Sequence, residues 1–461
     1  MRRAAVASLM ALAMLLGACG GGDDGGSEAA GSGELEGTEI TFSVSLAEEE
    51  QDAVQELLDQ FSEETGATVN LTSVSSADLP QKLRVEVGAG DPTIHLFAQD
   101  NLALRVLVDE NLVEDLSDVE LPDGIIESMI PEEFNGNTYF LPFRPNVRIA
   151  YANRDRFEAA DAERPTTTEE FREVAERLRA EANNTPKVTL SLAEGDPAAV
   201  TISEWIVSFG GNPLILNDEG SVEAFEFLQG MWRDGLLARE SLLAKFDTEV
   251  DYLQGETSWL AQNWPVTSAQ LNDQGLLEKF IVYEGWEGPE RAAHVIGGDV
   301  LGVPRGVSDE EREAALALAD FLISEDAQRT LVERNAWPSV RDDAYSDVPE
   351  EQADTFEAIQ AALEDGWYRP NVAYWPNVSE QMNAAVRRII VDGAPVQATL
   401  DELHGRIEAA ARAANAEYPP AEDGGDGGSA AGISPSPGTT PEASPTATAS
   451  PTATASPTAT S

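Results

Sequence analysis

The sequence has very few of the residues that build disulfides and metal sites. It contains one cysteine, Cys19, in 461 residues. The chain therefore cannot form an intramolecular disulfide, and a packed hydrophobic core must supply its stability. Its three histidines, at positions 95, 294 and 404, lie far apart and belong to no HExxH motif. Because a zinc site needs several ligands at short, fixed spacing, we expect no metal site and no cofactor.

Basic residues are also scarce. The chain has 29 lysines and arginines against 83 aspartates and glutamates, which gives a formal net charge of −54. Such a charge repels phosphate backbones, so nucleic acid is excluded as a partner. The sequence also lacks a Gly-x-Ser-x-Gly elbow and a phosphate-binding Gly-x-x-x-x-Gly-Lys-Ser/Thr loop. These absences argue against a hydrolase triad and against a nucleotide site.

Long hydrophobic runs are missing except near the N-terminus. There, Ala4 to Leu16 form an apolar run behind Arg2 and Arg3, but about 20 apolar residues are needed to span a bilayer. The run ends in Leu-Gly-Ala-Cys, with Cys19 last, which resembles the lipobox of bacterial lipoproteins. This resemblance implies a signal peptide cut before Cys19 and acyl chains on Cys19 that anchor the protein stably. We therefore expect a lipoprotein at the cell surface, held on the outer face of the cytoplasmic membrane.

Two low-complexity segments flank the body of the chain. Residues 20–36 are rich in Gly, Ser and acidic residues, and the segment after Tyr418 ends in repeats of Ser, Pro, Thr and Ala. Neither composition can build a core, so the first is expected to be a flexible linker and the second a disordered tail. A glycosylated stalk and an inert spacer both fit the tail.

The body alternates predicted strands with amphipathic helices. Strands are expected at Ile40–Val44, Val69–Val74 and Ile94–Ala98, with a helix after each of the first two. This order predicts a parallel sheet covered by helices. The body from Thr38 to Tyr418 exceeds what one core usually supports, so two α/β lobes are expected. Ligands of such sheets bind beyond the carboxyl ends of the strands, and two facing lobes form a cleft that closes by hinge motion.

Several motifs resemble a known family. Asn135-Gly-Asn-Thr-Tyr-Phe-Leu-Pro142, followed by Tyr151-Ala-Asn-Arg-Asp-Arg-Phe157, is similar to a "Gly-x-x-Tyr-x-x-Pro … Tyr-x-Asn-x-Asp-x-Phe" pattern. The run from Pro165 to Phe171 is similar to "Pro-x-Thr-x-x-Glu-Phe". Asp91-Pro92 departs from the pattern, which has Pro-Asp at this point. Together these motifs resemble the maltose-binding-like family 1 of extracellular solute-binding proteins, the sugar-binding lipoproteins of ABC importers.

The resemblance implies a periplasmic-binding-protein-like fold. Its features are two α/β lobes with mainly parallel sheets, a hinge, and an interlobe cleft. The expected boundaries are a signal peptide at 1–18, a linker at 19–37, lobe 1 at 38–146 plus 298–345, lobe 2 at 147–297 plus 346–418, and a disordered tail at 419–461.

Aromatic residues beside polar ones in predicted loops are candidates for sugar contacts. Flat rings stack on the C–H faces of sugars, and carboxylates, amides and arginine hold the hydroxyls. The candidate platforms are Trp264, Trp375, Trp286 and Tyr374. Core packing is the alternative role for each ring. The polar candidates are Asp299, Arg144, Asp100, Asn263, Glu284, Ser45 and Asp78. Among these, Arg144 either clamps a ligand or braces the hinge, and Asp100 either binds a ligand or caps a helix.

These patterns predict a receptor, not an enzyme. The protein is expected to capture a small polar solute, a sugar or oligosaccharide, and to deliver it as a monomer to the permease subunits of an ABC importer. A receptor for polyamines or another non-sugar solute is the main alternative. A secreted glycoside-acting enzyme is a further one, since a glycosidase needs only two positioned carboxylates. A surface adhesion protein would explain the repetitive tail.

Overall fold

The computed structural model describes residues 35–416, except 47, 77, 347 and 349, together with residue 418. Cys19, the expected signal peptide and the expected tail at 419–461 lie outside the described residues. Within the described part, no helix combines the length and the apolar character needed to cross a membrane.

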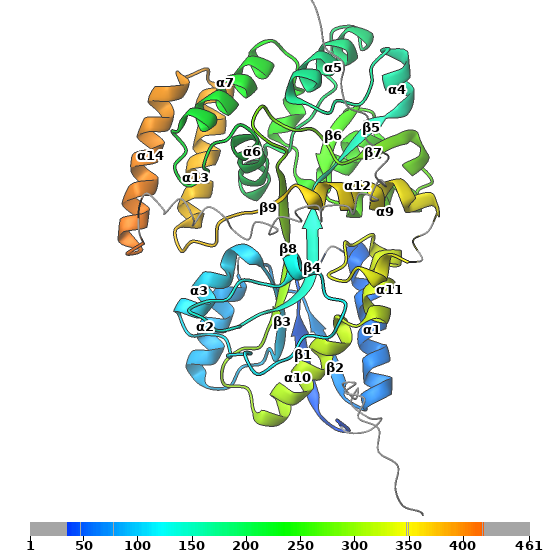
Figure 1. The fold of residues 1–461 in the computed structure, drawn as a ribbon, viewed down its shortest axis with the longest axis vertical. Helices are drawn as coiled ribbons and strands as arrows, with labels where there is room; N and C mark the ends of the chain where they lie inside the picture. The colour runs from blue at the N-terminus through cyan, green and yellow to red at the C-terminus, as the bar shows by residue number, and fades with distance from the viewer. Residues whose placement is uncertain are drawn as a thin grey trace, which may run out of the picture. The chain divides into compact units, whose positions relative to one another are not determined.

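The protein forms two compact units, each assembled from separate stretches of chain (Figure 1). Among the described residues, unit 1 comprises those within 35–126, 133–144 and 299–346, and unit 2 comprises those within 127–132, 145–298 and 348–418. Both units combine sheets with helices. The expected two-lobed α/β class is confirmed, but the expectation of mainly parallel sheets is wrong: the sheet of unit 1 has parallel and antiparallel pairs, and the pairs of the unit 2 sheet are antiparallel.

The sheet of unit 1 has the strand order β2-β1-β3-β8-β4. Its strands are β1 (Glu39–Ser43), β2 (Thr68–Thr72), β3 (Leu96–Asp100), β4 (Leu141–Val147) and β8 (His294–Gly302). The pairs β1–β2 and β1–β3 are parallel, as the alternating pattern predicts, whereas β8 runs antiparallel to β3. The first residues of β8 pair in parallel with β9 (Gly366–Tyr368) in unit 2.

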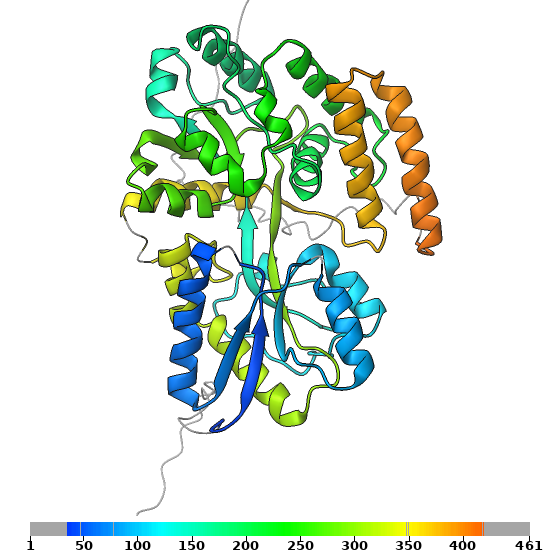
Figure 2. The same ribbon diagram turned by 180° about the vertical axis from the view of Figure 1, so that it is seen from behind.

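Helices cover both faces of this sheet (Figures 1 and 2). One face carries α1 (Glu48–Thr65), α10 (Asp309–Leu322) and α11 (Glu325–Asn335), and the other carries α2 (Leu79–Ala89) and α3 (Leu104–Asp109). The side chains of β3 alternate accordingly: Leu96 and Ala98 join the core beneath α1, and Phe97 joins the core beneath α2. This alternation follows from the two-residue period of a strand.

The first described residues correct one expected boundary. The composition assigns Leu35 to the linker, but its side chain is buried in the core of unit 1. The Leu35 backbone N–H donates to the Thr65 carbonyl at the end of α1, at 3.3 Å. The hydrophobic residue in an otherwise small and polar segment is therefore part of the fold.

Unit 2 is built around a three-stranded antiparallel sheet of order β6-β5-β7. The strands are β5 (Ile149–Asn153), β6 (Leu260–Asn263) and β7 (Phe280–Tyr283). The surrounding helices are α4 (Arg154–Ala159), α5 (Thr168–Glu181), α6 (Asp196–Ser208), α7 (Glu219–Arg233), α8 (Phe246–Gln254), α9 (Val266–Asp273), α12 (Ala353–Glu364), α13 (Trp375–Ala385), the π-helix η7 (Val386–Val391) and α14 (Val396–Ala413). Short 3-10 turns lie at η1 (Asn101–Ala103), η2 (Glu127–Met129), η3 (Arg239–Leu242), η4 (Leu277–Lys279), η5 (Asp343–Tyr345) and η6 (Glu350–Gln352).

Local signals start the helices where the sequence indicates. Thr167 accepts a hydrogen bond from the Glu170 backbone N–H and so caps α5. The Glu170 carboxylate accepts hydrogen bonds from the backbone N–H and the hydroxyl of Thr166, both at 2.8 Å. Ser308 and Glu311 form the reciprocal box at the start of α10. Each cap satisfies backbone donors that the first helical turn leaves free.

A buried ion pair lies in the core of unit 2. Arg148, between β4 and β5, is 0% exposed, and its Nη1 lies 2.5 Å from Oε2 of Glu204 on α6. Arg148 also donates to the Thr201 hydroxyl at 3.1 Å and to the Gln262 carbonyl at 3.0 Å. Oε1 of Glu204 accepts from the Val295 backbone N–H. Burial raises the pKa of Glu204, although the charge of Arg148 opposes the shift.

Candidate functional site

Three of the predicted polar residues come together at one edge of the unit 1 sheet. Asp100 ends β3, and in the antiparallel register it lies opposite Asp299 of β8. Nη2 of Arg144, from β4, binds Oδ2 of Asp299 at 2.6 Å. This edge is the carboxyl end of β1 and β3, where open α/β sheets bind ligands. The sequence does not indicate that these three residues lie close together, because their proximity depends on the pairing of β3 with β8.

Arg144 is held by more than one partner. Its Nη1 lies 3.0 Å from Oε1 of Glu50 on α1, and its guanidinium carbon lies 4.2 Å from the centroid of a Trp337 ring. The Trp337 indole N–H donates to the same Glu50 carboxylate at 2.7 Å. Burial opposes the positive charge, but Asp299 and Glu50 outweigh it and raise the pKa of Arg144. Within unit 1, Arg144 therefore braces α1 and β8 by binding their carboxylates.

Other polar atoms at this edge have no protein partner. Oγ of Ser43, Oε1 of Gln99 and Oδ1 of Asn101 are buried and accept or donate no hydrogen bond within the described structure. The amide nitrogen of Gln99 donates to the Ser76 carbonyl at 3.0 Å, which fixes the orientation of that amide. Buried polar atoms without partners are rare in native proteins. Gln99 and Asn101 flank Asp100 in the chain, and Ser43 ends the neighbouring strand β1.

Two further predicted residues of unit 1 lie near this edge. Ser45 follows β1 and is partly exposed. Asp78 is exposed just before α2, and its carboxylate accepts a 2.6 Å hydrogen bond from the Ser75 hydroxyl. Asp100 also caps η1, since its Oδ1 accepts from the Leu102 backbone N–H at 2.9 Å. Asp100 therefore fills the helix-capping role that the sequence offered as one of its two alternatives.

Unit 2 carries a pocket of about 660 Å³ that the sequence did not predict. It lies among the segment before α6, the turn η3, and the helix α13 with its π-helical continuation η7. The pocket is lined by Leu192, Glu194, Gly195, Leu242, Pro376, Ser379, Glu380, Asn383, Ala384, Val386, Arg387 and Val391. We call this the α13 pocket.

A two-way hydrogen bond holds one wall of the α13 pocket in place. The Gly195 backbone N–H donates to Oδ1 of Asn383 at 2.8 Å, and Nδ2 of Asn383 donates back to the Gly195 carbonyl at 3.0 Å. Gly195 has φ of 116° and ψ of −144°, a conformation that is essentially confined to glycine. The α13 pocket is therefore built on a backbone turn that requires glycine and is fixed by one amide side chain.

Three charged side chains of the α13 pocket point to solvent. Glu194, Glu380 and Arg387 are exposed and line the pocket. Several other arginines of the described chain are held by carboxylates, for example the adjacent Arg388 by Glu402 at 2.7 Å. Exposed charged groups at a pocket can form charge-assisted hydrogen bonds to a solute.

The predicted aromatic platforms are mostly packed into unit 2. Trp375 and Tyr374 are buried at the start of α13. Trp286 is buried against Phe171, with ring centroids 4.3 Å apart. Trp286 therefore packs in the core of unit 2, which is the alternative role that the sequence left open for it. The reason is that the turn after β7 folds this ring back onto α5.

Trp264 is the most open of the four rings. It is partly buried, and it meets Phe246 edge to face with centroids 5.4 Å apart. A Cβ atom at Gly297 would lie 3.2 Å from Cη2 of Trp264, so the ring rests closely on the backbone of β8. The neighbouring Asn263 is buried, and its amide nitrogen donates to the Phe246 carbonyl and to the Thr267 hydroxyl. Asn263 thus ties β6 to α8 and α9.

Glu284 is partly exposed after β7. Its Oε2 lies 4.0 Å from Nη1 of Arg164, at the limit of an ion pair. Neither the α13 pocket nor the edge of the unit 1 sheet includes Glu284. A role of Glu284 in ligand binding stays a prediction from the sequence.

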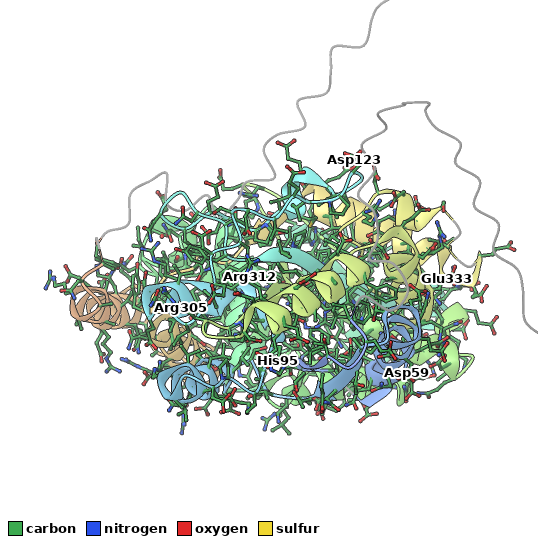
Figure 3. The ribbon with its side chains drawn as sticks, turned by 90° about the horizontal axis from the view of Figure 1, so that it is seen from below. Asp59, His95, Asp123, Arg305, Arg312 and Glu333 are labelled. Carbon is green, nitrogen blue, oxygen red and sulfur yellow. The ribbon has the colours of Figure 1, made fainter. Side chains whose placement is uncertain are left out.

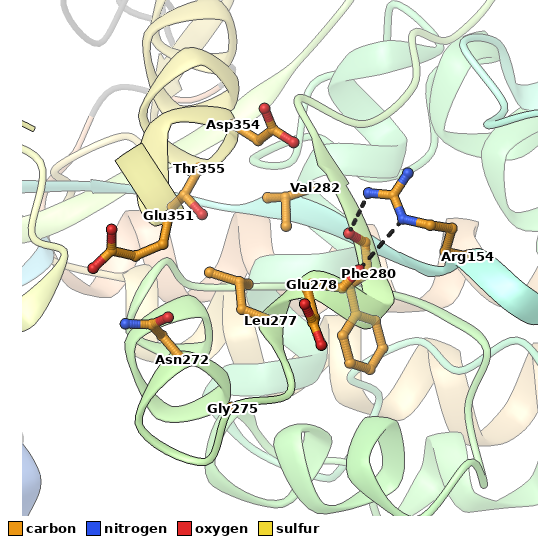
Figure 4. Close-up of a pocket in the computed structure, with 10 residues that line it drawn as sticks. All are labelled: Arg154, Asn272, Gly275, Leu277, Glu278, Phe280, Val282, Glu351, Asp354 and Thr355. Atoms are coloured by element: carbon orange, nitrogen blue, oxygen red, sulfur yellow. Dashed lines mark hydrogen bonds between the residues drawn. The ribbon is translucent and has the colours of Figure 1, made fainter. Parts of the chain in front are cut away.

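Figure 4 shows a second cavity of unit 2, of about 360 Å³, between β7, α9 and α12. Arg154 donates to the carbonyls of Glu278 and Phe280, so its guanidinium is used in holding the start of β7. The remaining charged residues of the cavity include Glu351 and Asp354, both carboxylates. Repulsion within this acidic lining disfavours an anionic ligand, and we assign it no function.

The histidines have structural surroundings. Nδ1 of His95 accepts from the Thr41 backbone N–H at 2.8 Å, and Figure 3 shows His95 on unit 1. His294 is buried, and His404 contacts the Ile215 carbonyl at 2.9 Å. No group of three or more His, Cys, Asp or Glu side chains in the described ranges could hold a metal ion.

The polar pattern along α13 did not by itself indicate the α13 pocket. Ser379, Asn383 and Arg387 recur every four residues, which places them on one face of a helix. A polar stripe of this kind usually faces solvent, so it carried no signal of its own. The packing of α13 against the segment before α6 turns the stripe into a pocket wall.

Comparisons with known proteins agree with this fold. A model of the bacterial extracellular solute-binding protein family matches residues 56–377. A comparison with curated proteins finds no match.

Solved structures share the fold across most of the chain. The maltose-bound MalE3 of T. maritima has a TM-score of 0.70 and 20% identity, over 81% of this chain and 99% of that one. A solute-binding protein of Agrobacterium radiobacter K84, in complex with ribitol, has a TM-score of 0.71 and 18% identity over the same shares. A solute-binding protein of Thermotoga lettingae TMO, bound to tagatose, has a TM-score of 0.71 and 17% identity, again over 81% and 99%. The family match covers more than half of the chain, so this protein belongs to the bacterial extracellular solute-binding protein family.

Proposed function

We propose that this protein is the receptor of an ABC importer and that it captures a sugar or a related polyol. The observation that carries the proposal is the pair of polar surfaces, one on each unit. The edge of the unit 1 sheet offers Asp100 and unpartnered polar atoms, and the α13 pocket offers Glu194, Glu380 and Arg387. Carboxylates, amides and a guanidinium are the groups that hold hydroxyls in fixed directions.

Relatives of the same fold support this class of ligand. The structures of MalE3 and of the two solute-binding proteins carry maltose, ribitol and tagatose. All three ligands are rich in hydroxyl groups and carry no formal charge. The excess of acidic residues in this chain is compatible with a neutral solute and disfavours an anionic one.

The cellular setting follows in part from the family. Membership of an extracellular family places the protein outside the cytoplasm. We further propose that lipid on Cys19 anchors it to the membrane, and that a monomer passes its solute to the permease without altering it. The interlobe cleft and the hinge remain predictions from the sequence. A polyamine receptor remains the main alternative, because acidic surfaces also suit cationic solutes.

A thermal-shift screen tests the class of ligand. The purified protein is heated with maltose, ribitol, tagatose, chitin oligosaccharides and, separately, spermidine. A ligand at a hundred times its dissociation constant should add about 2.7 kcal/mol to the free energy of unfolding. We expect a saccharide or polyol to raise the melting temperature. A shift with spermidine alone would replace the sugar proposal by the polyamine alternative.

Two substitutions test the two surfaces. Asp100→Asn removes the negative charge but keeps an oxygen that can cap η1. Glu380→Gln removes a negative charge from the α13 pocket. Each should weaken the best saccharide of the screen about tenfold or more, since a charge-assisted hydrogen bond contributes about 1.5–3 kcal/mol. Calorimetric titration measures the effect. Glu333→Gln, at an exposed position of α11 visible in Figure 3, is the matched control and should bind like the wild type. Unchanged affinity in both site variants would remove these surfaces from the proposal.

A further inference from the structure

One of the few clearly exposed large hydrophobic side chains of the described residues lines the α13 pocket. Among the described residues, the large hydrophobic side chains that are clearly exposed are Val85 (62%), Ile130 (44%), Leu243 (69%) and Val391 (38%). Val391 lines the α13 pocket, and Leu243 follows directly on the lining residue Leu242. Exposed apolar groups that gather beside a pocket commonly mark a binding surface.

The wall of the pocket is aliphatic. Leu192, Leu242, Val386 and Val391 line it together with Pro376, and no Trp, Tyr or Phe is among its lining residues in the described chain. Recognition of a sugar ring by stacking needs a flat aromatic face. Branched aliphatic side chains provide no such face, but they pack well around another aliphatic group. The wall therefore suits an alkyl group better than a sugar ring.

Polar groups stand at the same pocket. Glu194, Ser379, Glu380 and Arg387 offer donors and acceptors beside the aliphatic wall. The amide of Asn383 is already used by Gly195 and by the Ser379 carbonyl, so it shapes the wall. A solute that fills this pocket needs a hydroxylated part for the charged side chains and an apolar part for the wall.

The π-helix η7 explains how this wall arises. An α-helix continued from α13 would keep its 3.6-residue period, whereas a π-turn inserts an additional residue and rotates the side chains beyond it around the helix axis. Val386, Arg387 and Val391 of η7 all line the pocket. The Gln229 amide donates to the Ile389 and Ala394 carbonyls at 2.9 Å each, which fixes η7 against α7. The hydrogen bonds from Gln229 thus fix the position of the aliphatic wall within unit 2.

We propose that the α13 pocket selects sugars that carry an aliphatic substituent, with the alkyl group against Leu242, Val386 and Val391. This inference rests on the proposed function and narrows its substrate class. It concerns the part of the solute that the α13 pocket contacts. The hydroxylated part binds the carboxylates of the pocket.

A homologous series of ligands tests the inference. Methyl, ethyl and butyl glycosides of glucose, galactose and maltose are titrated calorimetrically into the purified protein. Burial of one methylene contributes about 0.8 kcal/mol, which corresponds to about fourfold in affinity. The butyl glycoside should therefore bind at least tenfold more tightly than the methyl glycoside of the same sugar.

Substitutions test whether the gain in affinity with alkyl length arises at the α13 pocket. Val391→Asp places a carboxylate in the aliphatic wall at a position exposed enough to tolerate it, and should bring the butyl and methyl glycosides to within about twofold of each other. Val85→Asp makes the same change on α2 of unit 1 and should leave the series unaltered. Melting curves of both variants establish that they fold.

The possible outcomes separate the two proposals. If sugars bind but the affinity is independent of alkyl length, the inference is wrong and the proposed function stands; the exposed aliphatic residues then belong to a protein contact. A gain that persists in Val391→Asp would also contradict the inference. If neither these glycosides nor any saccharide or polyol of the thermal-shift screen binds, both proposals fail.

Discussion

Replacing Arg148 by methionine is expected to lower the free energy of unfolding by about 3–5 kcal/mol, because the change leaves the carboxylate of Glu204 buried without its counter-charge. Arg148 is 0% exposed, and its Nη1 lies 2.5 Å from Glu204. The Gln262 carbonyl and the Thr201 hydroxyl lose their donors as well. Urea unfolding followed by tryptophan fluorescence measures the difference.

A surface pair provides the matched control. Arg156 lies 2.5 Å from Glu256, but the two side chains are 40% and 46% exposed. Arg156→Met should cost about 1 kcal/mol or less, as is usual for exposed pairs. The double variant Arg148→Met with Glu204→Gln should be more stable than Arg148→Met alone, since it removes the unpaired charge. Equal losses for Arg148→Met and Arg156→Met would show that burial does not govern this interaction.

Replacing Glu249 by glutamine is expected to stabilise the protein above neutral pH. Glu249 is 0% exposed on α8, and its carboxylate accepts hydrogen bonds from Thr189 and from Ser191. Burial raises the pKa of Glu249 from 4.5 to about 7, against the opposing effects of Thr189 and Arg148. Above that pH the folded protein holds a buried negative charge that glutamine lacks.

The direction of the pH effect follows from the sign of this shift. A folded-state pKa above the unfolded value gives stability that is fully present below about pH 4.5 and is lost as the pH rises through about 7. The shift corresponds to about 3 kcal/mol, an order-of-magnitude value. The difference in unfolding free energy between Glu249→Gln and the wild type should therefore grow from about pH 5 to about pH 8 by up to that amount. Urea unfolding across this range measures it.

The titration of His294 also changes the stability of the wild type with pH. The test therefore uses the difference in unfolding free energy between Glu249→Gln and the wild type. Burial, and next the charge of Arg148, lower the pKa of His294 from 6.5 to about 4. Its contribution to stability is therefore complete above about pH 6.5 and is lost as the pH falls toward 4. This slope opposes that of Glu249 in the wild type. Glu173→Gln, at an exposed position of α5, should follow the wild type at every pH; a matching rise in that control, or a flat difference for Glu249→Gln, would contradict the assignment.

The sequence predicted the local elements of unit 1 well. The strands expected at Ile40–Val44 and Ile94–Ala98 are found as Glu39–Ser43 and Leu96–Asp100. The helical spacing from Val54 to Phe61 became the buried face of α1. These elements are set by periodicity and by short crossovers, which are local properties of the chain.

The candidate site depended more on distant packing. The ion pair of Arg144 with Asp299 joins residues 155 positions apart, and the sequence offered a ligand clamp and a brace equally. Polar neighbours in the sequence predict Trp375 and Trp286 beside the ligand, yet their rings are buried. Polar neighbours in the sequence indicate that a segment is a loop. They do not determine whether a ring in that loop is buried, because burial depends on the elements that pack against it.

The π-helix was beyond the reach of periodicity. The apolar spacing predicts a continuous helix over Met382–Val391, but the chain changes from α13 to η7 at Val386. The apolar spacing alone does not show where the additional residue of a π-turn is inserted. The contacts of η7 with Gln229 of α7, which decide its geometry, come from a helix 160 residues earlier in the chain.

Calorimetric titration of the purified protein, combined with chromatography of the ligand afterwards, tests the central claim most directly. If the protein is a solute receptor, one saccharide or polyol of the panel binds with a stoichiometry of about one per chain, and it is recovered chemically unaltered after the protein is denatured. Failure of every saccharide and polyol to bind, or recovery of a cleaved product, would contradict it.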